Sequence, residues 1–196
     1  MDNDFDKIGL RIGNPENVEK VQWAEDFQLR KEHFKKENGS EGSLAVSIIP
    51  EYDISLLGKQ IDKYEIINLR IKSLYRPRDA YIDREIWSEK EDSKTLLFYQ
   101  GSFDLAEEIA RKAQTELEKK IFRKHFSCKG RGKSERRKFA QEEAQRQIIK
   151  LMTPFLKEFF TEQMEYEKNV GNPEKFEKNY SKYRARFDKL RKEISN

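Results

Sequence analysis

The chain has 196 residues, of which 36% are apolar and 39% are charged. This length allows one domain with a real core, or a small domain with a helical extension, and the high charge favours long water-exposed helices. Thirteen Phe, eight Tyr and two Trp exclude a chain that is disordered throughout, because they can bury a large apolar area. No stretch approaches the roughly 20 apolar residues of a membrane span, and the acidic N-terminus lacks the apolar run of a secretion signal.

The charge is unevenly distributed along the chain. Residues 1–100 carry 16 basic and 20 acidic side chains, whereas residues 101–196 carry 24 basic and 16 acidic ones. This asymmetry favours a second half that faces an anion, or two halves that face each other. The single cysteine excludes an internal disulfide, so we expect a cytoplasmic protein or one of an equivalent reducing compartment.

The first half of the chain predicts a helix and a small antiparallel sheet, which together form an α+β region over 14–100. Residues 1–13 are expected to form a flexible acidic arm. Asn14-Pro15 is a good helix start, with Asn as the cap and Pro at the first helical position, and this helix is expected to run to about Glu37. The segment 38–43, rich in Gly and Ser, then ends the helix.

Four short segments between 44 and 100 have the composition of strands. The alternation is clearest from 64 to 75, where Ile67, Leu69, Ile71 and Tyr75 are expected on one face. Short connections favour antiparallel pairing, because a parallel pair needs a crossover of a dozen or more residues. Residues 51–63 permit a short helix. The expected strands are Leu44–Ile49, Tyr64–Tyr75, Tyr81–Trp87 and Thr95–Gln100.

Residues 101–196 predict a basic three-helix region, which comprises a helical hairpin over 102–168 and a terminal helix over 173–194. Ser102 or Asp104 can cap the first arm of the hairpin, and Ser134 can cap the second. Two amphipathic helices joined by a short turn should pack antiparallel. The expected apolar stripes, in steps of three and four, are Ala106, Ile109, Ala113, Leu117 and Ile121 in the first arm, and Ala140, Ala144, Ile148, Leu151, Phe155 and Phe159 in the second. Thr153-Pro154 is expected to kink or restart the second arm without ending it.

The turn of this hairpin, over 127–133, lies in the most basic part of the chain. From Arg111 to Lys138 there are twelve Lys and Arg side chains and three acidic ones. Crowded like charges repel each other, so a bound polyanion would relieve them, and Phe122, His125 and Phe126 beside them can stack on a base. The alternative is a solvated helix tip whose phenylalanines turn to the core.

We therefore predict a non-enzymatic nucleic-acid-binding subunit of a larger nucleoprotein complex. It would contact the phosphate backbone of DNA or RNA with little sequence preference. The predicted nucleic-acid-binding residues are Arg123, Lys124, Lys129, Arg131, Lys133, Arg136, Arg137 and Lys138.

The terminal helix carries a regular aromatic seam with the spacing of a coiled coil of up to three heptads. The seam consists of Phe176, Tyr180, Tyr183, Phe187, Leu190 and Ile194. It either packs on the hairpin as a third helix or docks a partner protein. The second possibility makes an interaction or adaptor subunit the alternative function.

Several chemistries find little support in the sequence, and no cofactor is expected. Gly130 to Ser134 echoes a phosphate loop, but the first glycine is missing and a helix precedes it. A zinc site would need more ligands than His125 and Cys128. The cations around Cys128 favour a reactive thiolate, but no His-plus-carboxylate pattern of a catalytic thiol surrounds it. Asp2, Asp4 and Asp6 resemble a calcium loop that lacks its Gly and its final Glu. A metal-dependent nuclease is disfavoured, because its carboxylates would have to come from a charged loop that contains Glu89, Glu91, Asp92 and Lys94, with Asp83 at a distance from it.

Overall fold

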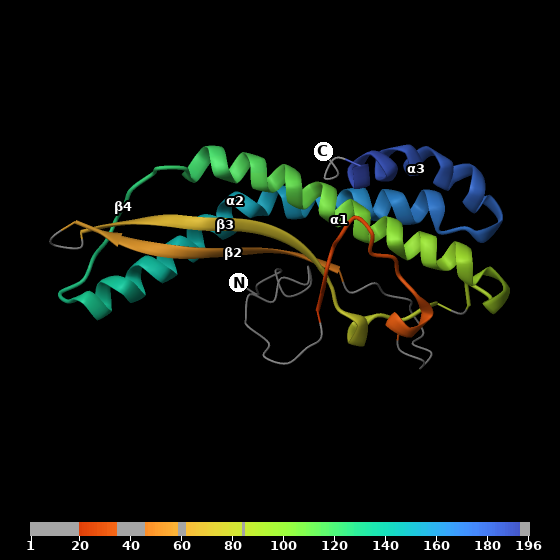
Figure 1. Ribbon diagram of the computed structural model, residues 1–196, viewed down its shortest axis with the longest axis horizontal. Helices are drawn as coiled ribbons and strands as arrows, with labels where there is room; N and C mark the ends of the chain where they lie inside the picture. The colour runs from red at the N-terminus through yellow and green to blue at the C-terminus, as the bar shows by residue number, and fades with distance from the viewer. Residues whose placement is uncertain (1–19, 35–45, 59–61, 84, 193–196) are drawn as a thin grey trace.

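The computed structural model describes residues 20–34, 46–58, 62–83 and 85–192 of the chain. Its fold is α+β, as the sequence predicts: a small antiparallel sheet lies against long helices (Figure 1). The strands are β1 (Val21–Gln22), β2 (Val46–Leu57), β3 (Lys63–Tyr75) and β4 (Phe126–Ser127). The α-helices are α1 (Asp92–Ile121), α2 (Lys133–Val170) and α3 (Phe176–Lys192). Short 3-10 helices lie at Lys31–His33, Pro77–Asp79, Glu89–Glu91 and Pro173–Lys175.

Strand β3 is the centre of the sheet. β2 pairs with β3 along nearly the whole length of β3. β1 pairs with the last residues of β3, and β4 pairs with its first residues. All three pairings are antiparallel. β2 continues through Pro50, which was expected to end a strand. Because only β3 is its neighbour among the described strands, β2 is an edge strand, where Pro is tolerated.

A bulge in β3 changes which side chains face the helices. Glu51 pairs with Arg70 and Asp53 with Ile67, so β3 has one residue more than β2 between these pairs. Asn68 lies there with φ 53°, a left-handed conformation that Asn tolerates. Ile67 is therefore off the face on which the alternation predicted it.

Helices α1 and α2 cover one face of the sheet, and a first core cluster fills the space between. All five apolar residues expected in the first arm of the hairpin are buried there, as are Ala140, Ala144 and Ile148 of the second arm. The helical hairpin is thus confirmed in its apolar stripes. Pro154 lies inside α2, which continues past it, and the Thr153 hydroxyl donates to the Ile149 carbonyl at 2.8 Å.

A second core cluster joins the N-terminal segment, the start of α1, the end of α2 and α3. Tyr166 and Phe187 are both buried in it, and Gly101 of α1 lets them approach closely. A Cβ at Gly101 would overlap the Tyr166 hydroxyl and lie 3.0 Å from the Phe187 ring. The Tyr166 hydroxyl donates to the Phe98 carbonyl at 3.0 Å. A glycine inside a helix, which usually lowers helix stability, is therefore required here by packing.

Further sequence expectations in the first half of the chain are wrong. Residues 51–57, where a short helix was possible, belong to β2. The described part of the helix expected over 14–37, residues 20–34, forms β1, a turn and a 3-10 helix. Residues 81–87 contain one bridge residue and a turn in place of a strand. Thr95–Gln100 belongs to α1, because an apolar run of this length suits a buried helix as well as a strand. The expected arm at 1–13 lies outside the described residues.

Candidate nucleic-acid interface

The connection between α1 and α2 crosses the end of the β2–β3 hairpin, at the end of the molecule that lies away from α3 (Figure 1). There β4 pairs with the start of β3, Ser127 with Lys63 and Phe126 with Tyr64. The Cys128 N–H donates to the Asp62 carbonyl at 2.7 Å. The connection is therefore an anchored crossing over 122–132, longer than the turn expected from the sequence.

Hydrogen bonds within the connection fix its second half against the start of α2. The Arg136 Nε donates to the Gly130 carbonyl at 2.8 Å, and the Arg131 N–H donates to the Glu135 carboxylate at 2.8 Å. Gly130 has φ 141°, and a Cβ there would lie 2.9 Å from the Arg136 backbone nitrogen. The N-cap of α2 is Gly132 and not Ser134, which lies inside the helix.

Residues 122–138, called the basic segment below, bring the predicted nucleic-acid-binding side chains together. The segment holds eight Lys and Arg and one acidic residue, Glu135. Seven of the eight cations are exposed, and Arg136 is half-buried. Within the described part of the chain, none of the eight forms an ion pair with a carboxylate within 4.0 Å. The alternative in which the two oppositely charged halves of the chain face each other is thus not seen at this segment.

The cations just upstream behave differently. Arg111 lies 2.9 Å from Glu107, Lys112 lies 2.5 Å from Glu158, and Lys119 lies 2.9 Å from Glu116. Of the twelve basic residues that the sequence groups together, these three are already neutralised within the chain. The free positive charge is consequently concentrated downstream of Ile121.

The cations at the end of α1 and those at the start of α2 also differ in how they interact with the helix dipole. Lys119 and Lys120 lie in the last turn of α1, where the partial negative charge of a helix C-terminus favours cations. Lys133 and Arg136 lie in the first turn of α2, where the partial charge is positive and favours anions. Helix stability therefore accounts for Lys119 and Lys120 and opposes Lys133 and Arg136.

The three aromatic side chains of the basic segment divide between core and surface. Phe126 is half-buried and stacks on the buried Tyr64, with ring centroids 5.3 Å apart. Phe122 is 69% exposed, and the Arg123 guanidinium lies 5.0 Å from its ring centroid. His125 is exposed, with its Nε2 3.8 Å from the Glu65 carboxylate. Of the two phenylalanines, only Phe122 remains available to a ligand.

The aromatic seam of α3, the predicted partner-binding surface, packs within the chain. Phe176, Phe187 and Leu190 are buried in the second core cluster, and Tyr180 and Tyr183 pack against it. Ile194 lies outside the described residues. The described residues of the seam therefore pack α3 against the rest of the chain as a third helix of the bundle, and docking of a partner protein stays a prediction.

The residues considered for catalysis do not form a reactive group. Burial raises the pKa of the Cys128 thiol, and its Sγ donates to the Arg136 carbonyl at 3.1 Å, so the thiolate that its cationic neighbours suggested is disfavoured. Asp92 pairs with Lys31, and Glu91 lies 3.7 Å from Lys94. In the described ranges, no three His, Cys, Asp or Glu side chains come together as a metal site would require. Asp2, Asp4 and Asp6 lie outside those ranges.

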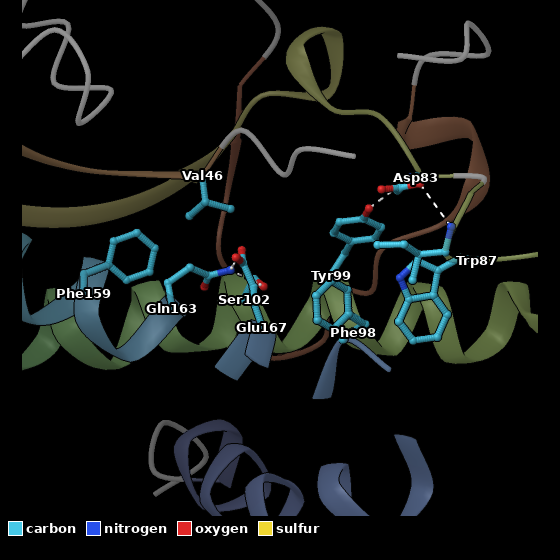
Figure 2. Close-up of a pocket in the computed structure, with 11 residues that line it drawn as sticks. Val46, Asp83, Trp87, Phe98, Tyr99, Ser102, Phe159, Gln163 and Glu167 are labelled. Carbon is cyan, nitrogen blue, oxygen red and sulfur yellow. Dashed lines mark hydrogen bonds between the residues drawn. The ribbon is translucent and has the colours of Figure 1, made fainter. Parts of the chain in front are cut away.

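A pocket of about 360 Å³ lies between the start of α1, the end of α2 and the segment before α1 (Figure 2). The Gln163 amide donates to the Ser102 hydroxyl and to the Glu167 carboxylate, both at 2.8 Å. The Tyr99 hydroxyl accepts from the Asp83 N–H at 3.3 Å. Neither group pairs a nucleophile with a base, so this pocket holds no recognisable catalytic arrangement.

Comparison with known proteins adds no assignment. No family model, no curated protein and no solved structure matches the chain. None of the helices in the described residues combines the length and apolar composition that crossing a membrane requires.

Proposed function

We propose that this protein is a non-enzymatic nucleic-acid-binding subunit that contacts phosphates through its basic segment. One observation carries the proposal: eight basic side chains and one acidic one lie in seventeen consecutive residues, and none of the eight is neutralised by a described carboxylate. Side chains that merely keep a surface soluble are usually of mixed sign. A concentration of one sign, held at one end of the molecule, suits a polyanion.

The anchoring of the segment supports the same function. β4 and the contacts of Cys128 and Arg136 hold the backbone, while seven cationic side chains remain exposed. A fixed array loses less conformational entropy on binding than a flexible tail. The start of α2 adds backbone N–H groups, which suit a phosphate oxygen. We expect contacts to the backbone of DNA or RNA, with little base readout from these residues.

Two further predictions remain proposals, namely the cellular compartment and membership of a larger complex. The lone cysteine suits a reducing compartment such as the cytoplasm, where we propose that the protein acts. Membership of a larger nucleoprotein complex stays a prediction, because the seam that suggested a protein partner is used inside the chain.

The test replaces the exposed cations and leaves the loop-forming Arg136 in place. The variant carries Gln at Arg123, Lys124, Lys129, Arg131, Lys133, Arg137 and Lys138. Binding to mixed-sequence DNA and RNA is measured by fluorescence anisotropy over a range of salt concentrations. We expect the variant to bind at least tenfold more weakly. We also expect the slope of log K against log salt to become flatter by about 0.7 to 0.9 for each phosphate that the variant no longer neutralises.

A matched control removes the same charge from another part of the surface. It carries Gln at seven exposed lysines of α2 and α3 and of the turn between them, namely Lys150, Lys157, Lys168, Lys175, Lys178, Lys182 and Lys192. A general charge effect would weaken binding equally in both variants. Equal weakening, or unchanged binding by the first variant, would contradict the proposal.

A further inference from the structure

Phe122 stands out among the apolar side chains of the described residues. It is 69% exposed, the largest value among the exposed large hydrophobic residues there. Its neighbour Ile121 is buried in the first core cluster, and Phe126 is half-buried against Tyr64. A Phe side chain left in water forgoes about 1.5–3 kcal/mol of burial energy. The core therefore does not account for an aromatic residue at this position.

The turn after α1 holds the Phe122 ring outward. The Phe122 N–H donates to the Glu118 carbonyl at 2.8 Å, and the Lys124 N–H donates to the Ile121 carbonyl at 3.0 Å. Between them, Arg123 adopts φ 55°, a conformation that non-Gly residues rarely take. With Arg123 in this conformation, its guanidinium lies 5.0 Å from the centroid of the Phe122 ring. An aromatic ring and a planar cation are thus presented together at the edge of the basic segment.

We propose that Phe122 and Arg123 form a stacking platform for an unpaired base, so that single-stranded nucleic acid is the preferred ligand of the basic segment. Aromatic rings and guanidinium planes stack on bases whose faces are free, and the bases inside a duplex have no free face. Lys124 follows this pair in the sequence, and it and the other exposed cations of the basic segment would hold phosphates of the same strand. This inference rests on the proposed function and assigns its ligand class.

The test uses Phe122→Leu, which keeps an apolar side chain of similar reach but removes the aromatic face. The matched control is Phe160→Leu on α2, another exposed phenylalanine that lies outside the basic segment. Three fluorescent probes are compared by anisotropy: an oligothymidine strand, a strand of equal length whose sugars carry no bases, and a DNA duplex. Thermal melts of the three proteins check that folding is unchanged.

We expect Phe122→Leu to weaken binding of the oligothymidine strand about tenfold, and to change binding of the base-free strand and of the duplex less than twofold. Phe160→Leu should change none of the three. Equal losses on the base-free strand, or a wild type that prefers duplex and is unaffected by Phe122→Leu, would overturn the platform. If the seven-Gln variant lost binding while Phe122→Leu did not, the phosphate-binding function would stand and the platform would be wrong. A wild type that bound no probe would overturn both.

Discussion

At the scale of the residue, Arg123 shows a conflict between backbone conformation and side-chain identity. The residue that follows the C-cap of a helix often adopts the left-handed conformation and is then usually Gly, which has no Cβ to clash. Arg123 takes φ 55° directly after the C-cap residue Phe122. An L-residue there costs about 1–2 kcal/mol relative to its ordinary conformations. The position is therefore not optimised for stability, which is common where a side chain serves binding.

Arg123→Gly should consequently stabilise the protein while it weakens nucleic-acid binding. We expect the free energy of unfolding to rise by about 1 kcal/mol, because Gly adopts this conformation without strain. The matched control is Arg137→Gly, which removes the same charge from inside α2 and should lower stability by about 1 kcal/mol. Urea denaturation of both variants measures the difference. Two changes of the same sign would contradict the backbone argument.

At the scale of the element, the N-terminal segment is tied to α1 and α3 through one buried carboxylate. Asp104 of α1 accepts from the Trp23 indole N–H at 2.8 Å and from the Arg191 guanidinium at 2.5 Å. Arg191 also donates to the Glu25 carbonyl at 2.6 Å and lies 5.2 Å from the Trp23 ring centroid. Asp104 was expected to cap a helix, but it lies in the interior of α1 because that helix begins at Asp92.

Burial raises the pKa of Asp104 from its ordinary value, although hydrogen bonds and the charge of Arg191 oppose this. The folded state then holds the proton more tightly than the unfolded state, so this group stabilises the fold less as pH rises between the two pKa values. Removing Arg191 raises the folded pKa further and leaves the carboxylate without its cation. The cost of that change must therefore grow with pH.

Arg191→Met should lower the free energy of unfolding by about 3 kcal/mol at pH 8, and by less at pH 5, where more of Asp104 is protonated. Urea denaturation at the two pH values measures the loss. The contacts of Arg191 with backbone carbonyls do not titrate, so they contribute equally at both. In an Asp104→Asn background the same substitution should cost the same at both pH values. A pH-independent loss in the wild-type background would exclude the carboxylate as its cause.

The elements differ in how far the sequence alone could predict them. The stripe from Ala106 to Ile121 follows from its spacing, because a long periodic segment has only one way to bury its apolar face. The start of α1 did not follow, because the apolar run Thr95–Gln100 suits a strand as well as a buried helix. β4 was missed because two residues carry no alternation, and their pairing with β3 is a tertiary contact.

The candidate site, too, is partly predictable from the sequence and partly dependent on tertiary contacts. Its charge can be counted from the sequence, and the eight cations are where that count places them. Which basic side chains of the wider region from Arg111 to Lys138 are free depends on partners distant in the chain, such as Glu158 for Lys112. The separation of Phe122 from Phe126 likewise depends on Tyr64, which comes from another element. Composition therefore predicts that the segment is basic, whereas the available charge and the available ring need the fold.

At the scale of the whole molecule, the proposed binding site and the packed aromatic seam lie toward different ends. The basic segment lies at one end, beside the first core cluster, and α3 belongs to the second cluster toward the other end (Figure 1). Val46 and Phe159 pack against both clusters, and α1 runs through both. Substitutions at distant sites without shared partners usually have additive effects. Stability changes in the second cluster should therefore leave nucleic-acid affinity unchanged as long as the protein is folded.

Phe187→Ala decides between the two uses of the aromatic seam. Phe187 is 2% exposed and contacts the rings of Tyr166, Tyr180 and Tyr183, so truncation should cost about 3–5 kcal/mol of stability. Phe160→Ala is the control, because Phe160 is 53% exposed and should cost less than about 0.5 kcal/mol. Thermal and urea denaturation measure both losses, and anisotropy at a temperature where both variants are folded should show wild-type affinity for nucleic acid. If the seam instead docked a partner, Phe187→Ala would leave the isolated chain as stable as the wild type, because the Phe187 ring would be buried only in the complex.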